Sequence, residues 1–327
     1  MRKDRGSGHG STTEWQNDET RNVHVRRAVI LGTMALVIAT GPAIGLAQGA
    51  RSTADARAEL LPRVRQFLAV EPLDPFTREL PLDEAYRWQD VFVELLAETH
   101  GDVAGYKTGG HDPGPANPYF PPGGIRGTLL EGMIEPSGTA IRPEETVWGF
   151  LEADLAVRVR DDAINAASTD LEILAGLDAV VPFLEIPDPA FRDDRRSATG
   201  SIVTNMASRY AFVGEPVPLE ATEDWLHRIR TFTFAVEDEQ GNEIGAGSMA
   251  DWYDPIAVVR WLRDQLRASG KRLSAGQLLS LGNIGITSPL KTGSPRGGPA
   301  YAGTRFTLSY DGLSDAGPAT VTIAIDR

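Results

Sequence analysis

Residues 148–159 read WGFLEADLAVRV, and this stretch decides the fold because its two faces differ. Apolar residues occupy every second position from Leu151 to Val159, a period of two that is typical of a half-buried β-strand. Side chains two residues apart on a strand point to the same face, so Glu152 and Asp154 lie side by side on the other face. Two adjacent carboxylates repel each other, and we therefore expect a positive group between them.

The overall composition is that of an acidic globular protein. The chain has 327 residues, of which 41% are hydrophobic and 24% charged, and its formal net charge is -13. The length predicts either two domains or one large β-rich domain. The acidic balance excludes nucleic acid as an expected partner, because no basic surplus is present to neutralise phosphates. The absence of cysteine excludes disulfides, thiolate metal sites and a cysteine nucleophile.

The first 50 residues have the features of a leader. Residues 1–27 are polar and end in two arginines, and residues 28–50 (AVILGTMALVIATGPAIGLAQGA) carry no charge. A basic region, an apolar core and small residues after it are typical of a secretory signal. A retained membrane anchor is the alternative, since about 20 uncharged residues can span a bilayer. We predict an exported protein, periplasmic or extracellular, that meets a membrane only through this segment if it stays uncleaved; a wrongly placed start codon would leave the protein in the cytoplasm.

The rest of the chain predicts a helical lead-in over residues 51–100 and a β-rich domain over residues 101–327. The Gly/Pro-rich segment 109–124 is long for a simple connection, so it is either a lid or binding loop or a plain surface excursion. The pattern predicts helices at 53–69, 81–98 and 254–268, and strands at 104–108, 128–134, 146–160, 179–186, 211–213, 228–237, 277–281, 305–310 and 319–325.

A third acid joins the pair on the first strand. Glu185 ends the apolar run AVVPFLE at residues 179–185, the pattern of a buried strand. With Glu152 and Asp154 it would supply three carboxylate groups to a hard divalent cation such as Mg²⁺ or Mn²⁺. The alternative is a solvated strand face on which Arg158 pairs with the acids, and spacing alone does not separate the two. The five histidines show no metal-binding spacing, which argues against zinc.

The order of short motifs resembles the 2-keto-4-pentenoate hydratase branch of the fumarylacetoacetate hydrolase superfamily. Six stretches match that branch in one continuous order over roughly residues 80–325. They correspond to a glycine-flanked lysine, the strand after it, the metal strand, the third metal ligand, an Asp-Asn-Ala-Ser stretch and a Gly-Ser loop with its helix. The stretches are GYKTGG (105–110), GTLLEGMI (127–134), FLEADLAVRVRD (150–161), VVPFLEIPD (180–188), NMASRYAFVG (205–214) and the segment 245–285, which begins GAGSMADW.

The resemblance implies a fold, a cofactor and a set of site residues. The fold would be α+β and β-rich, a mixed β-roll or sandwich of the fumarylacetoacetate hydrolase type with a few covering helices and an N-terminal helical lead-in. Glu152, Asp154 and Glu185 would hold Mg²⁺ or Mn²⁺, which binds a small 2-keto acid and stabilises its enolate. Lys107 would be a catalytic cation or proton shuttle, and Ser248 would be a catalytic residue that donates a hydrogen bond to the ligand carboxylate. The alternatives are a solvated strand lysine and a serine that only serves a glycine-rich turn.

The resemblance also implies a reaction class and an assembly. Members of the branch are hydratases of aromatic catabolism, and close relatives use the same enolate for decarboxylation or for hydrolytic C–C cleavage. The chain is therefore expected to be a hydro-lyase acting on a 2-keto acid or its 2-hydroxydienoate form. A homo-oligomer is expected because relatives assemble into rings and higher oligomers.

Several positions depart from the pattern of the branch. Asp154 stands where the second metal ligand is a glutamate, and Asn205 stands where an acid is expected, so it can bind substrate but cannot act as a base. Arg126 replaces an acid before GTL and is either an anion clamp for the substrate or a surface residue. Asp254 replaces a histidine and is expected to cap a helix. His111 is either a substitute proton-transfer group or a loop histidine without a role.

These departures leave two classes of function open. They fall on proton-transfer positions more than on metal positions, so the metal site looks retained while the acid–base groups are altered. One hypothesis is an exported hydratase-like lyase, with a decarboxylase as its near variant. The other is a non-catalytic descendant that binds a keto acid or a metal, or that serves as a structural subunit.

Overall fold

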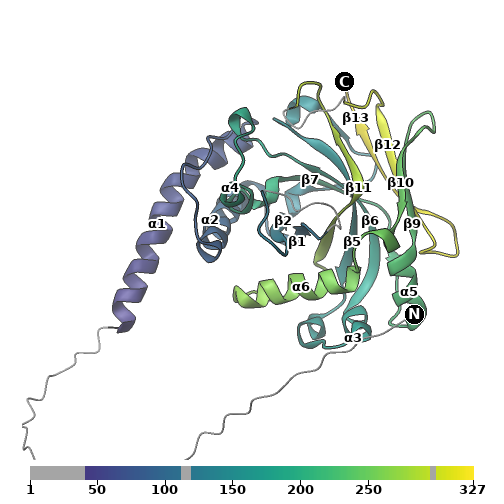
Figure 1. Ribbon diagram of the computed structural model, residues 1–327, viewed down its shortest axis with the longest axis horizontal. Helices are drawn as coiled ribbons and strands as arrows, with labels where there is room; N and C mark the ends of the chain where they lie inside the picture. The colour runs from purple at the N-terminus through teal and green to yellow at the C-terminus, as the bar shows by residue number, and fades with distance from the viewer. Residues whose placement is uncertain (1–40, 112–118, 295–299) are drawn as a thin grey trace, which may run out of the picture. The chain divides into compact units, whose positions relative to one another are not determined.

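The computed structural model describes residues 41–111, 119–294 and 300–327 (Figure 1). Contacts within the chain divide it into residues 1–44 and residues 45–327, and the fold is that of the second unit. Most of the predicted leader and the centre of the candidate lid therefore lie outside the described residues. In the part of the chain that is described, no helix combines the length and the apolar character needed to cross a membrane.

A mixed sheet of eight strands forms the body of the molecule. Its order is β2-β1-β11-β5-β6-β7-β3, with β8 paired to β6. The quoted stretch contributes β5, which pairs antiparallel with both neighbours, β11 and β6. These strands are β1 (Val103–Gly109), β2 (Ile125–Leu130), β3 (Ile134–Pro136), β5 (Phe150–Val159), β6 (Leu177–Pro187), β7 (Ser208–Val213), β8 (Val217–Pro218) and β11 (Leu278–Pro289).

A second sheet of five strands packs against the first. Its order is β10-β9-β12-β13-β4, and β12 and β13 contact β6 of the larger sheet. Apolar side chains from both sheets meet in one core, among them Leu155 of β5 and Leu308 of β12, both fully buried. The two sheets thus form the predicted roll or sandwich. The strands of the second sheet are β4 (Ala140–Ile141), β9 (Thr233–Asp238), β10 (Glu243–Ser248), β12 (Arg305–Asp311) and β13 (Ala319–Ile325).

Helices cover the larger sheet in two groups. In the first group α2 and α4 contact β2, and all three helices share a second apolar core that includes Phe92 and Ile125 (Figure 1). The second group includes α6, which contacts β11. Asp254 caps α6 as predicted, since its carboxylate accepts a hydrogen bond from the backbone N–H of Ile256 at 3.0 Å. The first group is α1 (Gly41–Leu68), α2 (Leu82–His100) and α4 (Ala198–Val203), and the second is α3 (Asp170–Ala175), α5 (Glu223–Thr231) and α6 (Pro255–Ala268).

Gly105, the glycine before the lysine of GYKTGG, is required by the packing of two strands. β1 runs parallel to β11, with Gly105 opposite Leu278. A Cβ atom at Gly105 would lie 2.0 Å from the backbone oxygen of Leu278, so no other residue fits there without moving a strand. The close approach holds β1 at the position from which Lys107 extends.

The predicted strand at 228–237 is wrong in its first part. Residues 223–231 form α5, and β9 begins only at Thr233. Thr222 caps this helix by accepting a hydrogen bond from the N–H of Trp225. Acids occupy the first turn and arginines the last turn, so the helix satisfies its own ends and outweighs the alternation that suggested a strand.

Candidate active site

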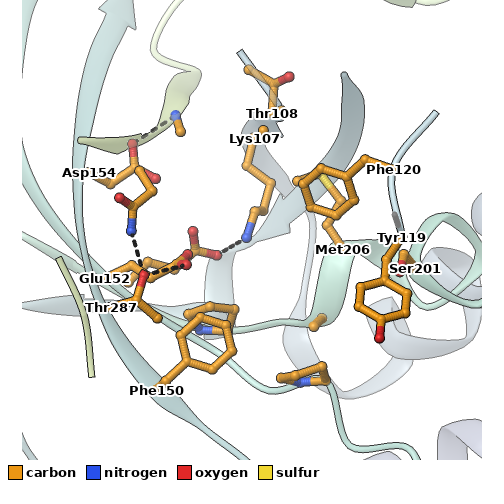
Figure 2. A pocket seen from close by; sticks show the side chains of 18 of the residues that line it. Lys107, Thr108, Tyr119, Phe120, Phe150, Glu152, Asp154, Ser201, Met206 and Thr287 are labelled. Carbon is orange, nitrogen blue, oxygen red and sulfur yellow. Dashed lines mark hydrogen bonds and ion pairs between the residues drawn. The ribbon is translucent and has the colours of Figure 1, made fainter. Parts of the chain in front are cut away.

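Three carboxylates lie on one wall of a cavity of about 330 Å³ (Figure 2). Glu152 of β5 and Glu185 of β6 are directly opposite each other in an antiparallel pair. Asp154 is two residues further along β5 and points to the same face. All three side chains line the cavity, so the structure brings together the residues that were predicted as metal ligands.

A lysine provides the positive group that the paired acids require. Lys107 of β1 forms an ion pair with Glu185, and both side chains are almost fully buried. The two side chains together bridge the strands that separate β1 from β6 (Figure 2). Arg158, the other candidate partner, instead pairs with Asp178 at 2.8 Å near the other end of β5. The acids are therefore not a solvated surface pair.

Asp154 is held by donors of the neighbouring strand. It is 1% exposed, and its carboxylate accepts hydrogen bonds from the Ser280 hydroxyl and the Gly282 N–H of β11, both at 2.9 Å. Burial raises the pKa of Asp154 well above its usual range, and the nearby charge of Glu185 raises this pKa further. An ionised Asp154 therefore needs a further positive charge nearby.

The donor set fits a hard divalent cation. With all three carboxylates ionised, the single ammonium would leave two negative charges, and buried charges are compensated by partners or by metal ions. As the side chains lie, the described residues contain no group of three or more acidic or histidine side chains close enough to hold an ion. Glu185 is turned to Lys107 and Asp154 to β11, so binding an ion would require Glu185 to turn away from the lysine.

Strand β11 supplies polar groups that the sequence did not indicate. Asn283 and Thr287 line the cavity opposite Asp154 and Glu152, respectively, in the register with β5. The Asn283 amide donates to the Thr287 hydroxyl at 3.2 Å, and this hydroxyl lies 3.5 Å from Glu152 (Figure 2). The register of β11 against β5 shifts twice here, before and after Asn283. Gly282, which precedes Asn283, has a φ of 106°. The glycines of GNIG were the signal for such an irregularity.

The remaining walls come from several loops, α4 and the start of β5, and they are largely apolar. Phe120, Met206 and Phe150 face the cavity (Figure 2). Polar lining residues of these walls, Tyr119, Arg196, Ser201 and Thr204, were not predicted as site residues. They lie in segments without a regular apolar period, so only the fold brings them to the cavity.

Arg126 is not an anion clamp. In the pairing of β1 with β2, Lys107 lies opposite Gly127 and Thr108 lies opposite Arg126. Arg126 is therefore one residue out of step with Lys107, and its side chain points to the other face of the sheet. Its guanidinium stacks on Tyr86 with 4.3 Å to the ring centroid and donates to Gln89 and Ser269. Burial lowers the pKa of Arg126. The side chain belongs to the packing between β2, α2 and the end of α6.

Asn205 and Ser248 also have positions different from those predicted. Asn205 is fully buried, and its side-chain amide bonds both backbone groups of Thr128, at 2.6 and 2.7 Å. Ser248 ends β10 in the smaller sheet, where its hydroxyl accepts a hydrogen bond from the N–H of Ala250. Neither is among the described residues that line the cavity. Both side chains bond to backbone groups in this structure, and their contact with a substrate stays a prediction.

His111 stands behind the cavity wall. Its Nε2 lies 2.8 Å from the hydroxyl of Thr108, which lines the cavity, and its ring meets the edge of Trp261. Because the Thr108 hydroxyl donates its proton to the Ile125 carbonyl, Nε2 is the donor to that hydroxyl. His111 is not itself a lining residue, so it orients Thr108 instead of facing the ligand.

The chain is similar to two curated enzymes, and no protein-family model matches it. It is 24% identical over 188 residues to 2-keto-4-pentenoate hydratase 1 of Dechloromonas aromatica (strain RCB), covering 57% of this chain and 63% of the relative. It is 24% identical over 191 residues to 4-oxalocrotonate decarboxylase of Pseudomonas putida, covering 58% and 66%. The matched segment therefore spans slightly less than two thirds of each relative.

Solved structures extend the likeness in fold. The 4-oxalocrotonate decarboxylase from Pseudomonas putida G7, complexed with magnesium and adipate, has a TM-score of 0.69 at 19% identity and covers 84% of this chain and 98% of its own. The same enzyme with calcium and acetate has a TM-score of 0.65 at 18% identity. The recognition from the motifs is confirmed: the chain has the α+β fold of the fumarylacetoacetate hydrolase superfamily and is similar in sequence to its 2-keto-4-pentenoate hydratase branch.

Proposed function

We propose that the protein is a divalent-metal-dependent lyase that acts on a small 2-keto acid or its 2-hydroxydienoate form, foremost as a hydratase. One observation carries this proposal: Glu152, Asp154 and Glu185 share a cavity wall with the buried Lys107. The cavity, at about 330 Å³, is at the small end of ligand pockets and suits a short acid. The sequence likeness to a hydratase and a decarboxylase supports the same class of chemistry.

The three carboxylates would hold Mg²⁺ or Mn²⁺. The ion, when bound, supplies a Lewis acid next to the 2-keto oxygen, where negative charge develops during the reaction. The Asp154 carboxylate is positioned for this role by Ser280 and Gly282. Among the three ligands, Glu185 is the one that must rearrange, because it is paired with Lys107.

Lys107 would then act on the substrate. Once Glu185 turns away, the ammonium group lies in the cavity without its former partner. A buried ammonium next to a developing anion can stabilise that charge or give it a proton. Phe120, Phe150 and Met206 give this part of the cavity an apolar lining, which strengthens both effects.

Decarboxylation is the second candidate. Adding water requires a general base to activate it, whereas loss of carbon dioxide requires only charge stabilisation and one proton donor. No histidine is present among the described residues that line the cavity, and its three carboxylates are all proposed metal ligands. Lys107 alone suffices for the simpler reaction. The lining therefore favours a decarboxylase over either reaction that activates water, and hydration stays the first candidate because of the sequence likeness to a hydratase.

The test is an assay with purified protein and Mn²⁺. Decay of the diene absorbance of 2-hydroxypenta-2,4-dienoate supports a hydratase, and carbon dioxide release from 4-oxalocrotonate supports a decarboxylase. Glu152→Gln should reduce the rate at least ~100-fold, because it removes a metal ligand, while Glu220→Gln, an exposed acid outside the cavity, should leave it unchanged. The non-catalytic hypothesis is favoured if neither substrate reacts but oxalate with Mn²⁺ raises Tm. A protein unaffected by metal in every assay would contradict the proposed function.

A further inference from the structure

Tyr310 of β12 bonds the backbone of the carboxylate wall from the core between the two sheets. Its side chain is fully buried. The hydroxyl donates to the C=O of Asp154 and accepts a hydrogen bond from the N–H of Phe183 at 3.3 Å. These two residues lie opposite each other in the pairing of β5 with β6. One hydroxyl from the smaller sheet therefore joins two strands of the larger sheet at the position of a proposed metal ligand.

The peptide between Asp154 and Leu155 is bonded at both of its polar groups. Its C=O accepts the hydrogen bond from Tyr310, and its N–H, which belongs to Leu155, donates to Oδ1 of the Asp154 carboxylate at 2.6 Å. In a planar trans peptide the C=O and the N–H point in opposite directions. A C=O that is held toward Tyr310 therefore aims the N–H at the carboxylate.

The two faces of β5 agree with this orientation. The Leu155 side chain lies in the same apolar core as Tyr310, whereas the Asp154 side chain lies on the cavity wall (Figure 2). In a regular strand both polar groups of a peptide bond to neighbouring strands. Here the register of β11 against β5 shifts on both sides of Asn283, the residue opposite Asp154. The ladder is interrupted at this position, so the peptide can serve the side chain.

The Asp154 carboxylate is thereby held by three donors of the described chain. Oδ1 accepts from the N–H groups of Leu155 and Gly282, and Oδ2 accepts from the Ser280 hydroxyl. A carboxylate has about four lone-pair sites, two on each oxygen, so the remaining site is on Oδ2. Hydrogen bonds of this kind orient a metal ligand, and their loss weakens metal binding.

We propose that Tyr310 is a positioning residue for the candidate metal site: its hydroxyl fixes the orientation of the peptide 154–155, and the N–H of this peptide holds the Asp154 carboxylate ready for a divalent cation. This inference rests on the proposed function, because it requires a cation at the carboxylate wall. It extends the set of residues that determine metal affinity to the smaller sheet, since Tyr310 is not among the described residues that line the cavity.

Removal of one oxygen atom tests the role of Tyr310. In Tyr310→Phe the C=O of Asp154 can bond directly to the N–H of Phe183, so the peptide turns and the N–H of Leu155 leaves the carboxylate. The Kd for Mn²⁺ should therefore rise about 10-fold, the lower end of the range for a lost partner of a metal ligand. Titration of the purified protein with Mn²⁺, with the free ion followed by electron paramagnetic resonance, measures this Kd without any substrate.

A second variant changes the peptide itself and leaves Tyr310 in place. Replacing Leu155 by its α-hydroxy acid puts an ester, which has no N–H, between residues 154 and 155. This variant should weaken Mn²⁺ binding by a similar factor, because the carboxylate loses the same donor. It carries the test if Tyr310→Phe does not fold.

Phe232→Leu is the matched control, because the Phe232 ring packs on Tyr310 with centroids 5.0 Å apart and has no polar group. It should lower Tm and leave the Kd for Mn²⁺ unchanged. If it raises the Kd as much as Tyr310→Phe does, core packing sets the affinity and the inference is overturned. An unchanged Kd in Tyr310→Phe, or in the ester variant, also overturns the inference but leaves the proposed function standing. A wild-type protein that binds no Mn²⁺ overturns both.

Discussion

Asn205 shows how one side chain can make an unfavourable backbone acceptable. Asn205, Met206 and Ala207 are three consecutive residues in the left-handed region, with φ of 57, 54 and 59°. Such residues are strained unless surrounding contacts hold them. Here the Asn205 amide binds the N–H and the C=O of Thr128, which lies on β2 at the edge of the sheet. The side chain thus bonds the edge strand β2 as a neighbouring strand would, and it fixes the turn that brings Met206 to the cavity.

We predict that Asn205→Ala lowers the free energy of unfolding by about 2–4 kcal/mol. The variant leaves two buried backbone groups of β2 without partners, at about 1–3 kcal/mol each. Urea denaturation followed by circular dichroism measures the change. Asn242→Ala, in an exposed turn, is the control and should cost less than about 1 kcal/mol. Asn205→Gly relieves the φ strain but lacks the amide; if it were as stable as the wild type, the two hydrogen bonds would not matter.

For single residues, the sequence predicted which side chains meet at the site better than it predicted what each side chain does. The period of two on β5 and the apolar run on β6 were enough to place Glu152, Asp154 and Glu185 on the faces that meet. Arg126 lies away from the cavity because a one-residue step on β2 decides which face a side chain takes, and a motif match does not define that step.

Ion pairs connect the helices α3, α5 and α6. Asp170, in the first turn of α3, pairs with Arg230 of α5 at 2.6 Å and with Arg260 of α6 at 2.5 Å. Arg230 also pairs with Asp254, the cap of α6. These contacts join helices that are far apart in sequence, and none of them could be read from a local pattern.

Asp170 should make the stability of the protein depend on pH in the acidic range. Its hydrogen bond with Arg230, and then that with Arg260, lowers the pKa of this carboxyl. The stabilisation is therefore present above the unfolded pKa of about 3.9 and is lost as pH falls through the lower folded value. We predict that Asp170→Asn is less stable than the wild type by up to about 1 kcal/mol at pH 7, since the group is partly exposed, and equally stable near pH 2.

Thermal unfolding of both proteins across this pH range measures the difference. Asp162→Asn, an exposed acid in the first turn of a neighbouring short helix, is a matched control and should show no such convergence. A constant gap between Asp170→Asn and the wild type at all pH values would mean that packing, and not charge, links the three helices.

Element prediction succeeded where end signals were strong and failed where elements were short. α6 was expected from its Asp-Pro start and from the apolar spacing, and the structure begins it at Pro255. α3 and α4 have six residues each, less than two turns, so no helical period can develop in the sequence. Their capping residues, Thr169 and Ser197, were the available signals.

For the whole molecule, the collinear motifs predicted the fold class but not the order of strands. The larger sheet places β11 between β1 and β5, although more than 100 residues separate β11 from either in sequence. Pairings of that kind depend on the complete core and leave no local trace in the chain. The cavity is a product of that order, since its walls come from segments spread between residues 107 and 287.

We propose that residues 1–50 are an export leader and that residues 51–327 contain the folded protein. Among the side chains of α1 that the structure describes, from residue 53 on, the first buried ones are Ala56 and Leu60, and they pack with α2. A chain that begins at residue 51 should therefore unfold with the Tm of the full-length protein. A chain that begins at residue 70 also loses Val64 and Phe67 and should be strongly destabilised.

Cell fractionation tests the export itself. The native protein should appear outside the cytoplasm, and N-terminal sequencing of that material should give a start near residue 50 if the leader is cleaved. Replacing Arg26 and Arg27 by glutamine should retain the protein inside, because it removes the basic region before the apolar segment. Purely cytoplasmic protein with an intact N-terminus would contradict the proposal.

Strand β11 is bonded to β1 on one side and to β5 on the other. Losing or gaining a residue there would shift two ladders at once, so this wall can diverge between lineages only by substitution. The opposite wall, at residues 119–120 and 187–207, consists mostly of loop segments and short helices that can change in length. The shape of the cavity can thus change from that side while the wall that carries the three carboxylates stays intact.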